Sequence, residues 1–538
     1  MLTRILTFFL LIGLIFRGLA FAADTEDRRA VLNGLAAPSR NTIMKSIEAL
    51  PATGGKYALP ALVALQEKRL GRDAGGRAVI VDEKTKSGIY ADTGEPFDGD
   101  IHSLETPVIN NRVRKMLKTA VAEMSLFAED LQARLHAARE LARSPQEDSV
   151  GRIRKALKQE KNNAVREALG MALALIEINS KQQAVRLKAI EQIGQSGNNQ
   201  FVYLLKPLLS KNAEGQYAEP DAEIRESARK AIADIESHVV MVRTVQDLFY
   251  GISLGSVLLL AALGLAITFG LMGVINMAHG EMLMLGAYAT YMTQGLFRLY
   301  FPGAIDWYLP AALPIAFGVA CLVGILMERC VIRFLYGRPL ETLLATWGIS
   351  LVLIQTVRLI FGAQNVEVAN PSWLSGAAEP MTGLVLTYNR LAIIGFVVVI
   401  VLLVYGLLNF TSLGLKVRGV TQNRPMAAAM GIQTARVDMW TFGIGSGIAG
   451  LGGVALSQIG NVGPELGQSY IVDSFMVVVL GGVGKIAGTV CGAMGLGVVN
   501  KFIEPHTGAV LGKILLLVFI ILFIQKRPQG MFAQKVRA

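Results

Sequence analysis

The residues whose chemistry could act on a solute lie in two segments of the second half of the chain, each within a long apolar stretch. The first segment carries an amide, an imidazole, a carboxylate and two glycines: Asn276, His279, Glu281, Gly280 and Gly286. The second carries a carboxylate, a hydroxyl and three glycines: Asp473, Ser474, Gly481, Gly482 and Gly484. Amide, hydroxyl, imidazole and carboxylate groups can all hydrogen-bond a polar molecule. We therefore expect these segments to contact a small polar solute.

Both segments interrupt stretches in which an unbroken membrane span would place leucine. Backbone that leaves the helix at membrane depth is tolerated only inside protein or around a cavity, and paired broken segments often mark the substrate path of a transporter. We predict that the polar residues line such a path, with Asn276 as a neutral hydrogen-bonding group and Asp473 as an acceptor at its entrance, and that the glycines act as hinges. In the alternative, Asn276, His279 and Glu281 lie in a cytoplasmic turn and the glycines allow close helix packing.

A short apolar helix is expected in the basic loop 411–438. Asn423 is a good N-cap, Pro425 suits the first turn, and Gly431 is a natural terminator after Met426–Met430. So short an apolar helix cannot bury itself. It requires a partner protein, or else it lies on the membrane surface.

Other chemistries are excluded or weakly supported. The chain has 3 cysteines and 5 histidines, without CxxC or metal-ligand spacing, so no metal or other cofactor is expected. Gly482–Ile486 is only distantly similar to a phosphate-binding loop, because Val479 stands where a glycine is needed and Ile486 replaces the residue that holds Mg²⁺. We expect no enzyme activity in this chain, and any ATP must be hydrolysed by another chain.

Nine apolar runs predict a polytopic α-helical membrane domain over 241–538, with about nine spans and a range of eight to ten. The runs lie at 248–270, 281–297, 309–330, 342–361, 391–409, 438–459, 471–483, 486–502 and 508–525. Nine crossings that start outside the cytoplasm place every cluster of basic loop residues inside it. Lys513 and Arg358 are expected to extend to the outer membrane surface. The glycines of the sixth run are expected to serve helix packing.

The first 240 residues have a different composition. They carry 34 basic and 30 acidic residues, whereas the remaining 298 carry 18 and 11. Because the signs are interleaved, the net charge of +11 indicates solvated helix faces and cytoplasmic loops rather than nucleic-acid binding. Residues 1–23 are typical of a cleaved signal peptide, which leaves 24–240 as an exported domain.

That exported domain is predicted to be mostly helical. Apolar periodicity indicates helices over 111–127, 131–143, 150–159 and 163–178, and alternation around Lys84–Lys86 indicates a small hairpin. Similar helix starts at Val165, Val185 and Ile224 favour a short solenoid. Because no catalytic grouping has helpful spacing, a scaffold or docking role is favoured over an enzyme. The predicted fold is therefore all-α throughout: a membrane domain preceded by a solenoid-like exported domain.

Four motifs, in order, resemble those of permease subunits of branched-chain amino acid ABC importers. They are Asn276–Glu281 with Gly286–Tyr288, Asn423–Ile432, Val478–Gly484 and Arg527–Phe532, and the resemblance covers essentially all of 245–535. The long exported domain before the first span resembles the extension that permeases of the urea-transporter branch of that family carry. The resemblance implies ATP-driven import of urea or a short-chain amide across the bacterial cytoplasmic (inner) membrane, with 24–240 in the periplasm.

The same resemblance implies partners. These are membrane lipid, a second related permease, two cytoplasmic ATPases and a periplasmic substrate-binding protein. It also implies that 422–432 is the coupling helix that docks on an ATPase, through Gln422, Asn423, Arg424, Pro425, Met426, Ala428, Met430 and Gly431. Three alternatives stay open at this point: a branched-chain amino acid permease, a passive urea or amide channel, and a membrane-anchored sensor with a ligand-binding solenoid.

Overall fold

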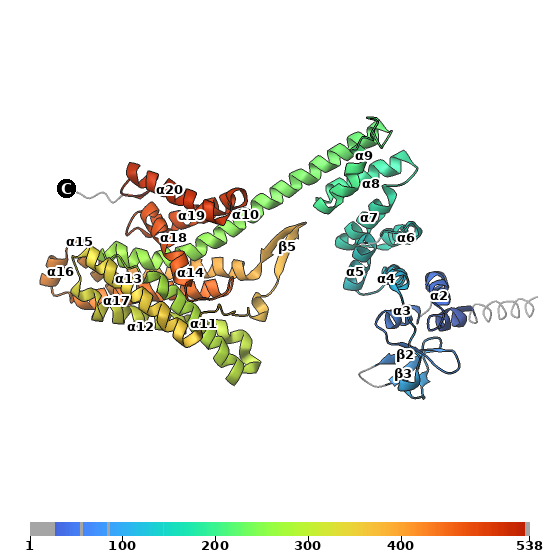
Figure 1. Cartoon of the computed structure of the whole chain (residues 1–538), viewed down its shortest axis with the longest axis horizontal. Helices are drawn as coiled ribbons and strands as arrows, with labels where there is room; N and C mark the ends of the chain where they lie inside the picture. Colours follow the sequence, from blue (N-terminus) through green and yellow to red (C-terminus); the bar gives the residue numbers. More distant parts are fainter. Residues whose placement is uncertain (1–26, 54–56, 83–86, 144, 533–538) are drawn as a thin grey trace, which may run out of the picture. The chain divides into compact units, whose positions relative to one another are not determined.

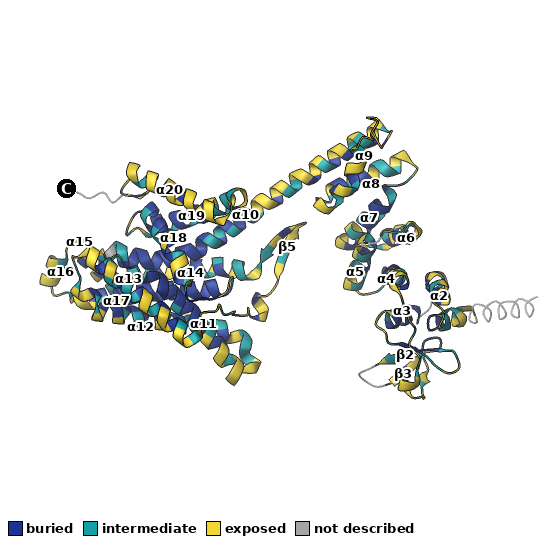
Figure 2. Ribbon diagram, viewed as in Figure 1, coloured by how far each residue is buried: buried dark blue, intermediate teal, exposed yellow. Residues whose placement is uncertain are grey.

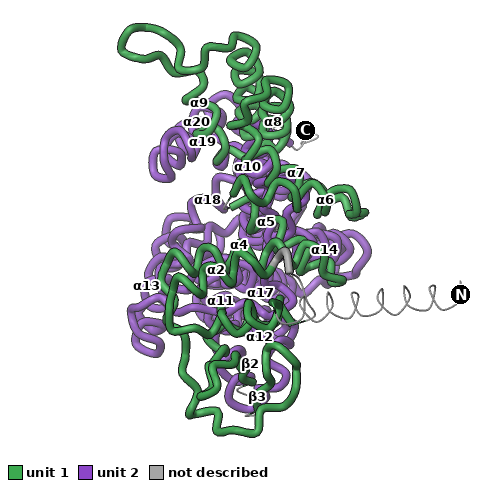
Figure 3. The backbone as a smooth tube through the Cα atoms, turned by 90° about the vertical axis from the view of Figure 1, so that its right-hand side faces the viewer, with its two compact units in different colours: residues 1–239 green, residues 240–538 purple. Residues whose placement is uncertain are grey.

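The computed structural model describes residues 27–53, 57–82, 87–143 and 145–532. The predicted signal peptide, 1–23, lies outside these residues. The chain divides into two compact units, Met1–Val239 and Val240–Ala538 (Figure 3). The boundary between the units falls within one helix, α10 (Ala222–Met272).

The first unit begins with helices and a small antiparallel sheet. The helices are α2 (Arg40–Thr53) and α3 (Ala58–Gln66). The strands β1 (Leu70–Arg72), β2 (Ala78–Asp82), β3 (Ser87–Tyr90) and β4 (Pro96–Phe97) pair in sequence order. Ile80 on β2 pairs with Ile89 on β3, so the predicted hairpin is confirmed, although its tip, 83–86, lies outside the described residues.

Helices fill the rest of the first unit, as Figure 1 shows. They are α4 (Asn111–Ser125), α5 (Leu131–Arg143), α6 (Val150–Gln159), α7 (Asn163–Glu177), α8 (Gln183–Gln195) and α9 (Val202–Leu209). The first four agree with the predicted helices to within two residues. Val165, Val185 and Ile224 are each the third residue of their helix, α7, α8 and α10, so the repeated helix starts are real.

Within the described residues of the second unit, nine long helices occur, and each coincides with one predicted apolar run. After α10 come α11 (His279–Tyr300), α12 (Tyr308–Cys330), α13 (Pro339–Phe361), α14 (Tyr388–Phe410), α17 (Thr434–Ser457), α18 (Leu466–Gly481), α19 (Ile486–Thr507) and α20 (Ala509–Lys526). In the described residues, seven helices are long and apolar enough to cross a membrane, and α11 and α18 are not among these seven. The all-α polytopic fold is confirmed, while the count of nine crossings stays a prediction.

Short elements connect these helices. The hairpin of β5 (Ala377–Met381) and β6 (Leu384–Thr387) precedes α14. Two short helices, α15 (Ser412–Gln422) and α16 (Arg424–Ala429), lie between α14 and α17. The start of the unit differs from the prediction. Helix α10 is 51 residues long and continues without a break through the domain boundary predicted between residues 240 and 241. No glycine or proline separates its amphipathic first part from its apolar second part before Gly251.

The core of the second unit is built around α17, which lies beside α11 and α12 (Figure 1). Every residue from Gly445 to Ser457 is buried, and Figure 2 shows the buried colour concentrated in this region. A Cβ on Gly450 would lie 2.8 Å from the backbone oxygen of Ala316 on α12, which is too close. The predicted packing role of these glycines is therefore confirmed, because small residues let helix backbones approach.

Candidate functional site

The break between α10 and α11 is a turn over 273–278 that begins at Gly273, which is exposed and whose φ of +67° favours glycine. Within it, the Asn276 side chain is completely buried, and its Oδ1 accepts a hydrogen bond from the Ala278 N–H at 3.0 Å. The next backbone N–H, that of Met277, donates to Thr346 Oγ1 on α13 at 3.1 Å. The turn is thus fixed by side chains rather than by helix hydrogen bonds.

Residues that follow Gly273 contact α13 inside the helix bundle. Thr346 and Ser350 are seven and eleven residues from the start of α13, so they lie about 10 and 16 Å along that helix. Both contact the region where α11 begins. Because α13 has 23 residues, Ser350 is near its middle. Gly273, by contrast, is exposed, so the alternative in which Asn276, His279 and Glu281 lie in a cytoplasmic turn stays open.

The first turn of α11 presents two buried ionisable side chains in different directions. His279 Nε2 lies 2.9 Å from the carbonyl oxygen of Ala261 on α10. Glu281 accepts a hydrogen bond at Oε1 from Ser350 Oγ at 2.9 Å. The carboxylate therefore faces α13, whereas the imidazole faces α10, and the two groups do not share one surface.

Three polar atoms of this turn have no hydrogen-bond partner among the described residues: Asn276 Nδ2, His279 Nδ1 and Glu281 Oε2. An unsatisfied buried polar group costs roughly 1–3 kcal/mol, so a fold retains several in one place only for a reason. A passing solute or ordered water would satisfy them. This concentration of unpaired atoms in one broken helix makes the α10–α11 turn the candidate site.

The second segment is oriented differently. Lys513 Nζ on α20 lies 3.0 Å from Asp473 Oδ2 on α18, so this carboxylate faces α20. Ser474 Oγ donates to the Tyr470 carbonyl of its own helix at 2.8 Å, and the side chain is buried. Hence the structure gives no contact between these two residues and the polar residues of the α10–α11 turn.

Lys513 and Arg358, which are expected to extend to the outer membrane surface, each have a carboxylate partner in the structure. Lys513 pairs with Asp473, and Arg358 of α13 pairs with Glu465 in the turn before α18. Each cation has a carboxylate from another helix or loop within reach, which the linear sequence does not show. Sequence reasoning also missed Thr346 and Ser350, although Thr342, Thr346 and Ser350 form a polar stripe at four-residue spacing that could have indicated them.

The glycines of the two segments fall into two groups. Gly280, Gly286 and Gly481 lie within helices, where an added Cβ would overlap the backbone of Gly467, Gly450 and Gly488, respectively. Their geometry is that of close helix packing. Gly482 and Gly484, by contrast, have φ values of +97° and +79° between α18 and α19, so these two positions require glycine for backbone conformation.

The chain end closes on this second break. The N–H groups of Met531 and Phe532 donate to the carbonyls of Leu480 and Gly481 at 2.9 and 3.3 Å. Gly530 also packs against Gly482. Two motifs that are about fifty residues apart in the sequence therefore form one structural unit.

The loop before α17 folds as predicted. Asn423 Oδ1 accepts from the Met426 N–H at 3.0 Å and caps α16, Pro425 is in its first turn, and Gly431 has a φ of +85° after its end. Of the helix residues, only Ala427 is buried. The remaining positions named above are exposed apart from half-buried Arg424: Gln422, Asn423, Pro425, Met426, Ala428, Met430 and Gly431. Met426 and Met430 are 59% and 78% exposed, so α16 and the residue after it present flexible apolar side chains at the surface of the unit.

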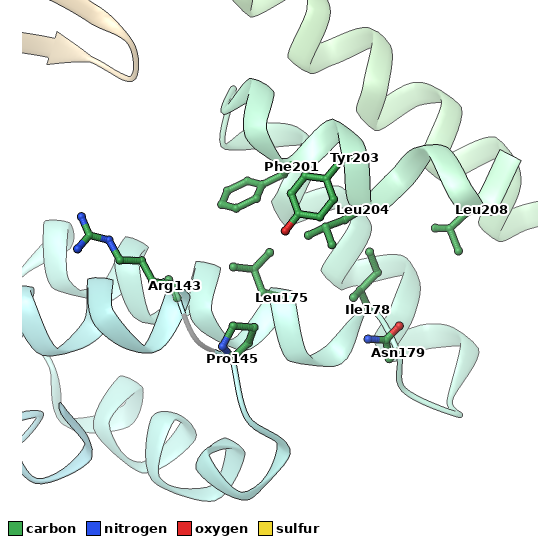
Figure 4. Close-up of a pocket in the computed structure, with 10 residues that line it drawn as sticks. Arg143, Pro145, Leu175, Ile178, Asn179, Phe201, Tyr203, Leu204 and Leu208 are labelled. Atoms are coloured by element: carbon green, nitrogen blue, oxygen red, sulfur yellow. The ribbon is translucent and has the colours of Figure 1, made fainter. Parts of the chain in front are cut away.

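A pocket in the first unit lies between α5, α7 and α9 (Figure 4). Its volume is about 230 Å³, and its lining is mainly apolar, with Leu175, Ile178 and Leu204 beside Arg143 and Asn179. The lining residues contain no pairing of a nucleophile with a base. In the described residues of the chain, no group of three or more His, Cys, Asp or Glu side chains could hold a metal ion.

The second unit is similar in sequence to known transport proteins. The sequence model of the family described as "Branched-chain amino acid transport system / permease component" matches residues 248–524, more than half of the chain. The permease protein LivH of a high-affinity branched-chain amino acid transport system from Salmonella typhimurium is 29% identical over 54% of this chain and 96% of its own length. BraD from Pseudomonas aeruginosa, with the same description, is 30% identical over the same shares. The fructose import permease protein FrcC of Rhizobium meliloti is 28% identical over 42% of this chain and 61% of its own length.

Proposed function

Because the chain belongs to the family of branched-chain amino acid transport system permease components, we propose that it forms the translocation path of an ATP-driven importer in the inner membrane. The observation that carries the proposal is the α10–α11 turn with its three unpaired buried polar atoms. A path for polar solutes needs such groups at membrane depth, where an inactive helix bundle would not keep them. The path itself passes beside this turn.

Partner chains complete the transport cycle. We propose that α16, with its exposed Met426 and Met430, docks on a cytoplasmic ATPase subunit. A periplasmic binding protein delivers the solute, and a second related permease completes the membrane path. The first unit, 24–240 by prediction, lies in the periplasm and serves as a scaffold or docking domain rather than as an enzyme.

Two cargoes compete for this path. The names of LivH and BraD favour a branched-chain amino acid, and on the comparisons alone this cargo is the better supported. Urea or a short-chain amide is supported by two other observations. The first unit is outside the matched region, as expected for the urea branch that the sequence resembles. The polar groups of the turn are also mostly neutral donors and acceptors, with Glu281 as the one carboxylate among Asn276, His279, Thr346 and Ser350.

The cargo is tested by uptake into proteoliposomes that contain the complete importer with ATP. Radiolabelled urea and radiolabelled leucine are compared, each with an excess of the other as competitor. Uptake of urea that leucine does not inhibit supports the urea proposal. Uptake of leucine without urea supports the amino acid alternative, and mass spectrometry of the ligand released from the co-purified binding protein checks either result independently.

The docking role of α16 is tested by Ala428→Glu, which adds a charge on an exposed position of this helix. If the helix docks on an ATPase, solute uptake falls while expression is unchanged. The matched control is Ala435→Glu, which adds the same charge at an exposed position in the first turn of α17. Uptake that is unchanged in Ala428→Glu would refute the docking assignment.

A further inference from the structure

One charged side chain of α16, that of Arg424, links this helix to α17. Arg424 makes two hydrogen bonds to Asp438 in the second turn of α17, one from Nη1 to Oδ1 at 3.3 Å and one from Nη2 to Oδ2. The carboxylate is nearly inaccessible, with 2% of its side chain exposed, whereas the Arg424 side chain is 42% exposed. A bidentate arginine–carboxylate pair of this kind fixes the relative orientation of the two side chains as well as their distance.

A second contact adds to this geometry. The Arg424 guanidinium carbon lies 4.6 Å from the centre of the Tyr336 ring, in the segment that precedes α13. Apolar packing on α16 is limited to Ala427, which meets Val417, Val420 and Val437. Because Ala427 is the one buried residue of α16, the Arg424–Asp438 pair adds a directional link between this helix and α17 to a small apolar contact.

From Asp438, close packing continues to the α10–α11 turn. Gly445 on α17 meets Gly264 on α10 backbone to backbone, and a Cβ on Gly264 would lie 2.9 Å from the His279 ring. Farther along α17, Gly453 contacts the α11 backbone at Leu283. Helices in such contact cannot absorb a shift by side-chain rearrangement, since there are no side chains between them.

We propose that Arg424 is a positioning residue for transport: its pair with Asp438 makes α16 and α17 move together, so that a displacement of α16 reaches the turn that carries Asn276 and His279. The inference rests on the proposed function, because it takes α16 as the surface on which the ATPase acts. The coupling belongs to the pair and not to either charge alone. Exchanging the two charges should therefore restore what removing one of them destroys.

The experiment measures ATP hydrolysis and solute uptake in the same reconstituted importer. Arg424→Gln and Asp438→Asn each lower the solute taken up per ATP hydrolysed by about tenfold, which is the size of a typical coupling between sites. The exchange variant, Arg424→Asp with Asp438→Arg, recovers most of the wild-type ratio. A role of Arg424 in direct contact with the ATPase would not be rescued by a change at Asp438.

The matched control is the exposed pair Arg338–Glu341, whose side chains are 65% and 54% exposed at 3.0 Å. Arg338→Gln is expected to leave the uptake per ATP unchanged. If Arg424→Gln does not assemble with the ATPase, Arg424→Lys is used, because it keeps the charge and loses the bidentate geometry. A lowered ratio of solute uptake to ATP hydrolysis in an assembled complex supports the inference.

Two results would overturn it. One is a normal ratio of uptake to hydrolysis in the assembled single variants, and the other is a single-variant defect that the exchange does not repair. Failure of the proposed function is seen separately, because the wild-type importer would then show no ATP-dependent uptake of urea or leucine.

Discussion

Ser350 Oγ of α13 donates a 2.9 Å hydrogen bond to Glu281 Oε1 in the first turn of α11. This bond joins the middle of one long helix to the broken start of another. The other carboxylate oxygen, Oε2, is buried and has no partner among the described residues. The protein therefore satisfies one oxygen of the Glu281 carboxylate, while the other lies near Gly467 of α18 without a hydrogen-bond partner in the part of the chain that the structure describes.

Replacing Glu281 tests whether this half-satisfied group serves transport. Glu281→Gln keeps the shape and should lower uptake by about tenfold or more, because loss of one hydrogen bond to a charged group amounts to roughly 1.5–3 kcal/mol. Initial rates of ATP-dependent uptake measure the effect, with Glu341→Gln as the exposed control. An unchanged uptake rate in a folded Glu281→Gln importer would contradict a role for this residue in the path.

The packing of α11 on α17 predicts a contrast between two glycine substitutions. Gly286→Ala places a Cβ against the Gly450 backbone and should lower the thermal stability of the purified protein. Gly395→Ala on α14 has nothing within 4 Å of its added Cβ, so the better helix propensity of alanine should leave stability unchanged or raise it by up to about 1 kcal/mol. Melting of the detergent-solubilised chain compares the two, and equal melting temperatures would rule out the proposed contact.

The Asp473–Lys513 pair makes a prediction about folding. Lys513→Met leaves the carboxylate of Asp473 without its cation and should destabilise the membrane domain, by less than the roughly 3–5 kcal/mol of a fully buried pair because the Lys513 side chain is 48% exposed. Asp473→Asn with Lys513→Met removes both charges and should restore most of the loss. Unfolding of the full chain in detergent is the measurement. The control is Lys501→Met, because Lys501 pairs with a partly exposed glutamate, Glu504, on its own helix. Equal losses in the single and double variants would argue against the pair.

The first unit should lose stability in acid at an identifiable place. Arg134 hydrogen-bonds Glu160 at 2.7 Å and holds the pKa of this carboxyl below its ordinary value, against the opposing effect of burial. A carboxyl with a lowered pKa in the folded state stabilises the fold above its unfolded pKa, about 4.3, and this stability is lost as the pH falls through the lower folded pKa. Amide hydrogen exchange in α5 and α7 of the full chain, corrected for intrinsic rates, should therefore accelerate below about pH 4.3.

Glu160→Gln provides the control for that pH dependence. The variant should show faster exchange in these helices near neutral pH and a weaker acceleration in acid, since it has no carboxyl to protonate. A variant that keeps the full wild-type pH dependence would show that the Arg134–Glu160 pair does not contribute to it.

Local patterns were sufficient to predict much of this fold. Apolar runs located the nine long helices, and the three types of residue at Asn423, Pro425 and Gly431 predicted α16 because each acts on its own turn. Contacts across helices were beyond such patterns. The partners of Asp473 and Glu281 are 40 and 69 residues away, and periodicity does not state which face of one helix meets which face of another.

For the candidate site as well, local features were predictable from the sequence and contacts between helices were not. Composition and breaks indicated that 276–281 and 473–484 are unusual, but the expectation that both sets of polar residues line one path joined residues that face different helices. Asp473 faces α20, while Glu281 faces α13. The hydrogen bonds from the Met531 and Phe532 N–H groups to the carbonyls of Leu480 and Gly481 were also not predicted, because residues 527–532 have no periodic pattern.

The central claim, that this chain is the permease of an ATP-driven importer, is tested most directly by solute flux in proteoliposomes with and without ATP. The complete importer should accumulate its solute against a gradient only with ATP and the binding protein present, and the chain without the ATPases should conduct no rapid downhill flux. Rapid downhill flux of urea through this chain alone, independent of ATP, would contradict the account and identify a passive channel.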